Sequence, residues 1–172
     1  MSLKRTSPTS RSNRSSSLGK ALFLLAAVAL AVASCGRLPV YSHYEHISSD
    51  SWRRDDTISF TAIVADSADY HLTLGLRATN AYPYTQLKVN ANILTPHTSH
   101  LSPHTSHLTP LTIDITNAEG EMQGRGNNIR HYTVPIGDIT LSRNDTLTVS
   151  IHHAMSRFSL PGIIDVGLTV ER

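Results

Sequence analysis

Residues 87–93 read Leu-Lys-Val-Asn-Ala-Asn-Ile, so that apolar and polar side chains alternate over seven positions. Successive side chains of a β-strand point to opposite faces of a sheet, and this period of two therefore predicts a strand with one buried face. The same alternation recurs on both sides of this segment. Its apolar positions are Ile58, Phe60, Ala62 and Val64; Leu72, Leu74 and Leu76; Leu111, Ile113 and Ile115; Leu147, Val149 and Ile151; and Ile164, Val166, Leu168 and Val170.

Short alternating segments separated by Asn, Asp, Gly and Pro are typical of antiparallel sheets that pack face to face. No stretch of ten residues shows a convincing 3.6-residue period of a helix. The sequence therefore predicts an all-β protein with a single antiparallel β-sandwich over residues 52–172, either immunoglobulin-like or jelly-roll-like.

The N-terminal region has a different character. An uncharged apolar run at residues 21–33 follows five cationic side chains and ends directly before Cys35, the only cysteine. The run is too short to span a bilayer comfortably and is typical of a cleaved secretory signal. Small residues before a cysteine suit a lipoprotein signal peptidase, so we predict a lipoprotein signal peptide at residues 1–34 and lipidation of the Cys35 thiol. The alternative is a free buried cysteine.

Residues 35–51 are polar and lack a regular period, and they are interpreted as a lipidated tether that holds the domain on a membrane. Cleavage also changes the charge balance. The whole chain has 15 Lys and Arg against 13 Asp and Glu, but five of the cations lie in the predicted signal peptide. The mature chain thus has a net charge of −3, which argues against nucleic acid as a partner.

A seven-residue repeat, Pro-His-Thr-Ser-His-Leu-Ser/Thr, occurs twice in residues 96–109 and is followed by Pro110. One apolar residue in seven cannot build a core, so the repeat predicts a low-complexity, His-rich loop at 96–110. Imidazole is a common ligand for zinc, copper and nickel. We nevertheless favour adventitious binding over a specific site, and predict no metal and no other cofactor; the weak metal candidates are His97, His100, His104 and His107.

Trp52, Asp55 and Asp56 resemble a carboxylate pair beside an aromatic platform, as glycosidases and sugar-binding modules use. Adjacent strand residues point to opposite faces, however, and an aspartate turn that leads into the strand at Thr57 is the favoured interpretation. The sequence lacks a Gly-x-Ser-x-Gly motif, and His152-His153 has no recognisable nucleophile partner. An enzyme is therefore not predicted, and a hydrolase that uses Asp55 or Asp56 is the weakest hypothesis.

Two further segments could reach a partner. The turn from Asn80 to Tyr84 holds Tyr82 and Tyr84, which either form a binding surface or pack under the sandwich edge, and packing is favoured. The glycine-rich loop around Arg125 permits positive φ angles, but its spacing is not that of a phosphate loop.

Several clusters together resemble the gliding-motility lipoproteins of the GldH type. They cover nearly all of the mature chain: Trp52-x-x-Asp55-Asp56-Thr57-Ile58-x-Phe60, Asn80-x-Tyr82-Pro83-Tyr84-x-x-Leu87, Gly124-x-Gly126, Ala154-Met155, and Gly162-Ile163-x-Asp165-Val166-Gly167. The resemblance implies a non-catalytic, lipid-anchored cell-envelope protein that supports the gliding machinery, which is tied to type IX secretion. The histidine repeat at 96–110 departs from the pattern.

We therefore expect docking to other envelope proteins of the gliding and secretion machinery. The candidate contact residues are Trp52, Asp55, Asp56, Asn80, Tyr82, Tyr84 and Arg125, because aromatic and Arg side chains are favoured at interfaces. A periplasmic module that binds a glycan or a peptide is the alternative. Gly36-Arg37 lacks the acidic run that, by resemblance to lipoproteins of such bacteria, directs export to the cell surface, which favours a periplasm-facing position, with the outer membrane preferred over the inner.

Overall fold

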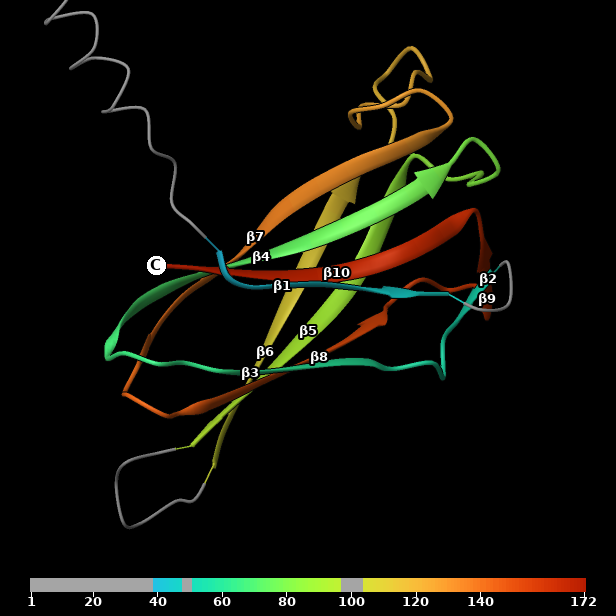
Figure 1. The fold of residues 1–172 in the computed structure, drawn as a ribbon. Coiled ribbons are helices and arrows are strands. Elements are labelled where there is room, and N and C mark those ends of the chain that lie inside the picture. Colours follow the sequence, from blue (N-terminus) through green and yellow to red (C-terminus); the bar gives the residue numbers. More distant parts are fainter. Residues whose placement is uncertain (1–38, 48–50, 97–103) are drawn as a thin grey trace, which may run out of the picture. The chain divides into compact units, whose positions relative to one another are not determined.

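The computed structural model describes residues 39–47, 51–96 and 104–172, and these residues form ten β-strands (Figure 1). The predicted signal peptide and Cys35 lie outside these ranges. Within them, no helix is long and apolar enough to cross a bilayer. The strands are β1 (Pro39–His46), β2 (Ser51–Arg53), β3 (Ile58–Ile63), β4 (Ala68–Thr79), β5 (Gln86–Pro96), β6 (His104–Asp114), β7 (Ile129–Leu141), β8 (Thr146–His153), β9 (Ser159–Pro161) and β10 (Ile163–Glu171).

The strand pairings are nested. β1 pairs with β10, β2 with β9, β3 with β8, β4 with β7 and β5 with β6, all antiparallel. The chain is thus one long antiparallel ribbon that turns back at the β5–β6 hairpin. Two more pairings, β10 with β4 and β8 with β5, roll the ribbon into sheets of order β1-β10-β4-β7 and β3-β8-β5-β6. This is a jelly roll, so the all-β sandwich is confirmed and the jelly-roll alternative is the one observed.

The alternating apolar positions form the core between the two sheets. The largest fully buried side chains come from both sheets, from β2 and β9, and from the residue directly after β6: Trp52, Tyr70, Phe60, Leu72, Leu74, Leu76, Leu87, Ile115, Leu147, Ile151, Leu160 and Ile163. Their burial removes apolar surface from water, which is the main force that holds the sheets together.

Antiparallel strands give the sandwich two distinct ends. We call the end where β1 starts and β10 finishes the N-proximal end; it also holds residues 64–67 and 142–145. We call the opposite end the distal end; it holds residues 51–57, 80–85, 115–128 and 154–162. The strands of the two four-stranded sheets run between these ends, whereas the short strands β2 and β9 lie at the distal end (Figure 1).

Two predicted boundaries were wrong. Residues 39–46, assigned to the tether, form β1, and the domain therefore begins at Pro39 instead of Trp52. The strand is hard to recognise because its residues after Val40 are polar or aromatic on both faces, and backbone pairing with β10 holds it. Residues 104–110, assigned to the His-rich loop, belong to β6. β6 is an edge strand, which tolerates polar side chains and Pro110.

Candidate functional site

A row of polar side chains crosses the outer face of the β1-β10-β4-β7 sheet near the distal end. In register, His46 lies opposite Asp165, Asp165 opposite Arg77, and Arg77 opposite His131. A bridge from the 115–128 loop places Arg125 opposite His131. Residues opposite one another in a sheet share a face, so all five side chains emerge on the same side. We call His46, Asp165, Arg77, His131 and Arg125 the polar row.

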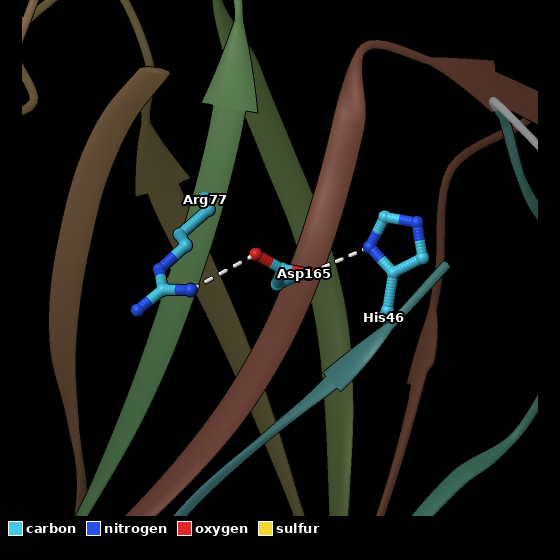
Figure 2. A network of polar contacts seen from close by, with 3 residues as sticks. All are labelled: His46, Arg77 and Asp165. Atoms are coloured by element: carbon cyan, nitrogen blue, oxygen red, sulfur yellow. Dashed lines mark hydrogen bonds and ion pairs between the residues drawn. The ribbon is translucent and has the colours of Figure 1, made fainter. Parts of the chain in front are cut away.

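Asp165 is the centre of one half of the row. Only 14% of its side chain is exposed, and its carboxylate accepts hydrogen bonds from Arg77 Nη1 at 3.2 Å and from His46 Nδ1 at 2.9 Å (Figure 2). A largely buried carboxylate requires such partners, because burial without them is costly. The interaction joins three neighbouring strands, β1, β10 and β4.

Tyr44 lies beside this half of the row. It is opposite Gly167 in register, and Gly167 is opposite Gly75. A Cβ at Gly75 would come 2.2 Å from the Tyr44 hydroxyl oxygen, and one at Gly167 would come 2.6 Å from the ring. The ring therefore needs glycine at both positions. The guanidinium carbon of Arg77 lies over the ring, 4.3 Å from its centroid, so the ring is held between the sheet and Arg77.

Two clefts flank the 115–128 loop at the distal end. The first, which we call the row cleft, has a volume of about 630 Å³, and Arg125, His131 and Tyr44 line it together with Asp114 and Gln123. The second, the turn cleft, has a volume of about 600 Å³; Asn80, Tyr82, Thr116, Gly120, Glu121, Met122 and Arg130 line it. The polar row thus opens at its Arg125 end into a cleft.

The loop between the clefts is held by short contacts to β7. Arg125 and His131 exchange both backbone hydrogen bonds, at 3.0 and 2.8 Å, which extends the sheet by one short segment. The Arg130 side chain donates to the Gly124 carbonyl at 3.3 Å, and the buried Tyr132 hydroxyl donates to the Ile115 carbonyl at 3.1 Å. The position of Arg125 is therefore set by backbone pairing.

Trp52 was predicted as a contact residue and is instead fully buried. Its indole Nε1 donates to the Asp56 carbonyl at 3.1 Å, because a buried N–H needs an acceptor. Asp56 in turn accepts the Arg53 N–H at 3.3 Å, and Asp55 forms an ion pair with Arg53 at 2.8 Å. The aspartate turn is confirmed, and both carboxylates remain exposed at the distal end.

Tyr82 is also buried, which confirms the packing interpretation and contradicts its prediction as a contact residue. Its hydroxyl donates to the Gln86 carbonyl at 2.9 Å, and burial raises the pKa of this hydroxyl. The half-buried Tyr84 ring packs edge-on against it, with 5.5 Å between centroids. Asn80 and Arg125 are exposed and line the turn cleft and the row cleft, respectively.

Most of the polar row is not predicted from the sequence. Arg125 is among the predicted contact residues, but His46, Arg77 and His131 are not. β1 and β7, which supply His46 and His131, are not recognisable as strands from the sequence. Asp165 was noted only within a family-like cluster. A polar residue at every second position of an outer face gives no signal of its own until the register is known.

The histidine candidates are divided between described and undescribed residues. His97 and His100 lie outside the described ranges, and His104 is the first residue of β6. His107 is exposed, and its Nδ1 forms a hydrogen bond with Thr109 Oγ1 at 3.1 Å. Among the residues that the structure describes, no three His, Cys, Asp or Glu side chains are placed to hold a metal ion.

His153 is the one histidine of the described residues that is fully buried, with its ring edge-on to Trp52 at 5.4 Å between centroids. Burial is the main cause that lowers the pKa of His153, and Arg54 and His152 act in the same direction. In an unfolded chain the pKa of histidine is about 6.5. Below that pH the unfolded chain binds a proton that the folded chain excludes, so we expect the free energy of unfolding to fall on acidification.

Urea denaturation at pH 7.5 and pH 5.5 tests this expectation. The variant His153→Phe keeps an aromatic ring beside Trp52 but cannot bind a proton. Its stability should therefore depend less on pH over this interval than that of the unmodified protein. An equal loss of stability in both proteins would show that His153 does not contribute to the pH dependence.

Comparison with known proteins gives a family and several solved structures of low sequence identity. No curated protein matches the sequence. Among solved structures, the Cry4Aa toxin of Bacillus thuringiensis gives a TM-score of 0.45 at 6% identity, over 75% of this chain and 23% of the toxin. A protein of Sulfurospirillum deleyianum gives 0.38 at 11% identity, over 76% of this chain and 96% of that one. The VP2 subviral particle of infectious bursal disease virus gives 0.31 at 14% identity, over 76% of this chain and 32% of that one.

These scores are too low to inform the function. The chain spans only about a quarter of the toxin's length. The family comparison is of a different kind, because the model of the GldH lipoproteins matches residues 39–170. The match starts at the first residue of β1 and ends at Val170, one residue before the end of β10, so it spans the jelly roll, the polar row and both clefts. The chain therefore belongs to the GldH lipoprotein family, the gliding-motility-associated lipoproteins.

Proposed function

We propose that this protein is a non-catalytic, lipid-anchored docking protein of the gliding machinery, which binds other envelope proteins at its distal end. The observation that carries the proposal is the start of the domain at Pro39, four residues after Cys35. Four residues reach at most about 14 Å. A lipid on Cys35 would therefore keep the N-proximal end close to the membrane surface.

The distal end is separated from that surface by the length of the strands. β1 has eight residues, which extend roughly 26 Å at about 3.3 Å per residue. Both clefts, the basic end of the polar row and the exposed residues Asp55, Asn80 and Arg125 lie at the distal end. This arrangement supports docking of a partner on the side away from the lipid.

The carboxylates of the hydrolase hypothesis have structural partners. Asp55 forms an ion pair with Arg53, and the Asp56 carboxylate accepts the Arg53 N–H in the turn that follows Trp52. These contacts support a role in building the turn. A link to type IX secretion and a periplasm-facing position on the outer membrane complete the proposal. The first rests on the family membership, and the second on the lack of an acidic run at Gly36-Arg37.

Photo-crosslinking in the native envelope tests the docking surface. A photoreactive amino acid is placed at the exposed distal residue Asn80 and, as the matched control, at the exposed N-proximal residue Arg143. We expect gliding or secretion components to be captured from Asn80 and not from Arg143. Capture from Arg143 alone, or no protein adduct from Asn80 in anchored protein, would contradict the proposal.

The anchor is tested with Cys35→Ala. If the Cys35 lipid alone holds the protein on the membrane, nearly all of the variant should leave the membrane fraction, and the Asn80 adducts should be lost. Fractionation with immunodetection measures the first effect. Retention of the variant on the membrane at the wild-type level would show a second anchor.

A further inference from the structure

We propose that the basic end of the polar row, formed by Arg125 and His131 beside Arg77, binds acidic side chains of a partner protein. The inference rests on the proposed docking function and specifies the partner's chemistry. Within the row, the single carboxylate, Asp165, already has Arg77 on one side and His46 on the other. Arg125 and His131 are exposed, and neither forms an ion pair with any residue in the described part of the chain.

The geometry of these three side chains fits carboxylates. Arg125 and His131 form a hydrogen-bonded pair, so their Cα atoms lie about 5.5 Å apart and their side chains share one face. Arg77 follows on the next strand, which gives a basic segment roughly 10 Å long at about 4.8 Å per strand. A guanidinium can bind a carboxylate through two parallel hydrogen bonds. The row cleft of about 630 Å³ provides room for acidic side chains beside Arg125.

Two features favour a protein over a glycan or a phosphate polymer. A sugar ring usually stacks on an open aromatic face, but Tyr44 has Gly75 and Gly167 on one side and Arg77 over the ring. Asp114 also lines the row cleft, held by a hydrogen bond from Gln86 at 2.8 Å. Its negative charge disfavours a dense polyanion and is compatible with well-separated Asp or Glu side chains.

Fluorescence anisotropy with a labelled 12-residue peptide of alternating Glu and Ser tests the proposal. The full mature protein is used in lipid nanodiscs, and the matched probe replaces every Glu with Gln. We expect the Glu peptide to bind and the Gln peptide not to bind. Arg125→Glu should weaken binding of the Glu peptide about tenfold or more. Arg125→Ala is expected to give a smaller loss, because it adds no repulsion.

Arg143→Glu is the matched control, since it makes the same charge change at an exposed arginine of the N-proximal end. It should leave binding of the Glu peptide unchanged. Equal weakening by Arg143→Glu would overturn the proposal in favour of unspecific charge attraction. Equal binding of the Gln peptide, or tighter binding of a galacturonate oligosaccharide or of inorganic phosphate, would also overturn it.

Failure of this inference is distinguishable from failure of the proposed function. If Asn80 still captures envelope proteins while the Glu peptide does not bind, docking is retained and the acidic partner is refuted. If the Glu peptide binds at Arg125 but Asn80 captures no protein, the basic site is real and the docking proposal is refuted.

Discussion

Replacement of Trp52 by alanine is expected to lower the free energy of unfolding by about 3 to 5 kcal/mol. Trp52 is the central residue of β2 at the distal end, and its side chain is fully buried in the core with its ring edge-on to His153. Truncation leaves a cavity that the surrounding side chains cannot fill. It also removes the indole N–H that the Asp56 carbonyl accepts, so the turn from Arg53 to Asp56 loses a fixed contact.

Phe158→Ala provides the matched control. Phe158 is an aromatic residue of the same end of the sandwich, but it is 56% exposed, and the Arg53 guanidinium lies over its ring at 5.1 Å from the centroid. Its removal should cost no more than about 1 kcal/mol. Urea unfolding of both variants, followed by tryptophan-independent far-ultraviolet circular dichroism, measures the difference. Similar losses for the two variants would contradict a core role for Trp52 and restore it as a surface residue.

The sequence predicts those strands that have a clean alternation between a buried and an exposed face. β3, β4, β5, β8 and β10 are of this kind, and their apolar positions form the core. β7 was missed because its alternation is interrupted. A register shift opposite Leu72 and Thr73 places a bulge near Pro135 and Gly137. The alternation of inward-facing and outward-facing side chains shifts by one residue there.

The candidate contact residues show how far the type of a residue predicts whether its side chain lies on the surface. All seven candidates lie at the distal end, but burial removes Trp52 and Tyr82 from the surface. An aromatic residue beside a turn can either face a partner or cover the core, and the sequence does not distinguish the two. The polar row could not be predicted either, because it requires the register of four strands and a loop.

The nested ribbon also explains where the histidine repeat can be accommodated. The β5–β6 hairpin is the turning point of the ribbon, and Pro96 lies opposite His104 across it. Extra residues at this point lengthen only β5 and β6 and do not shift the register of the other strand pairs. A duplicated segment there leaves the remaining pairings intact, and its second copy continues into an edge strand where polar side chains are tolerated.

Gly162→Ala is expected to be strongly destabilising. Gly162 has a φ of +82°, and an added Cβ would lie 2.3 Å from the Tyr82 backbone nitrogen and 2.7 Å from the Ala81 carbonyl carbon. These are backbone atoms of a turn held by the Thr79 N–H, which donates to the Gly162 carbonyl at 2.8 Å. The clash cannot be relieved by rotating a side chain.

Gly120 separates the two contributions, because it has a φ of +83° and no atom within 4 Å of an added Cβ. Gly120→Ala should therefore cost only the backbone strain, about 1 to 2 kcal/mol. Gly162→Ala adds overpacking of about 1 to 3 kcal/mol to the same strain. Urea unfolding of both variants gives the difference directly. Equal losses of stability would mean that the turn can move to accommodate the added Cβ. A larger loss at Gly162 would show that the Tyr-Pro-Tyr and Asp-Val-Gly clusters pack rigidly against each other and so position Asn80 at the turn cleft.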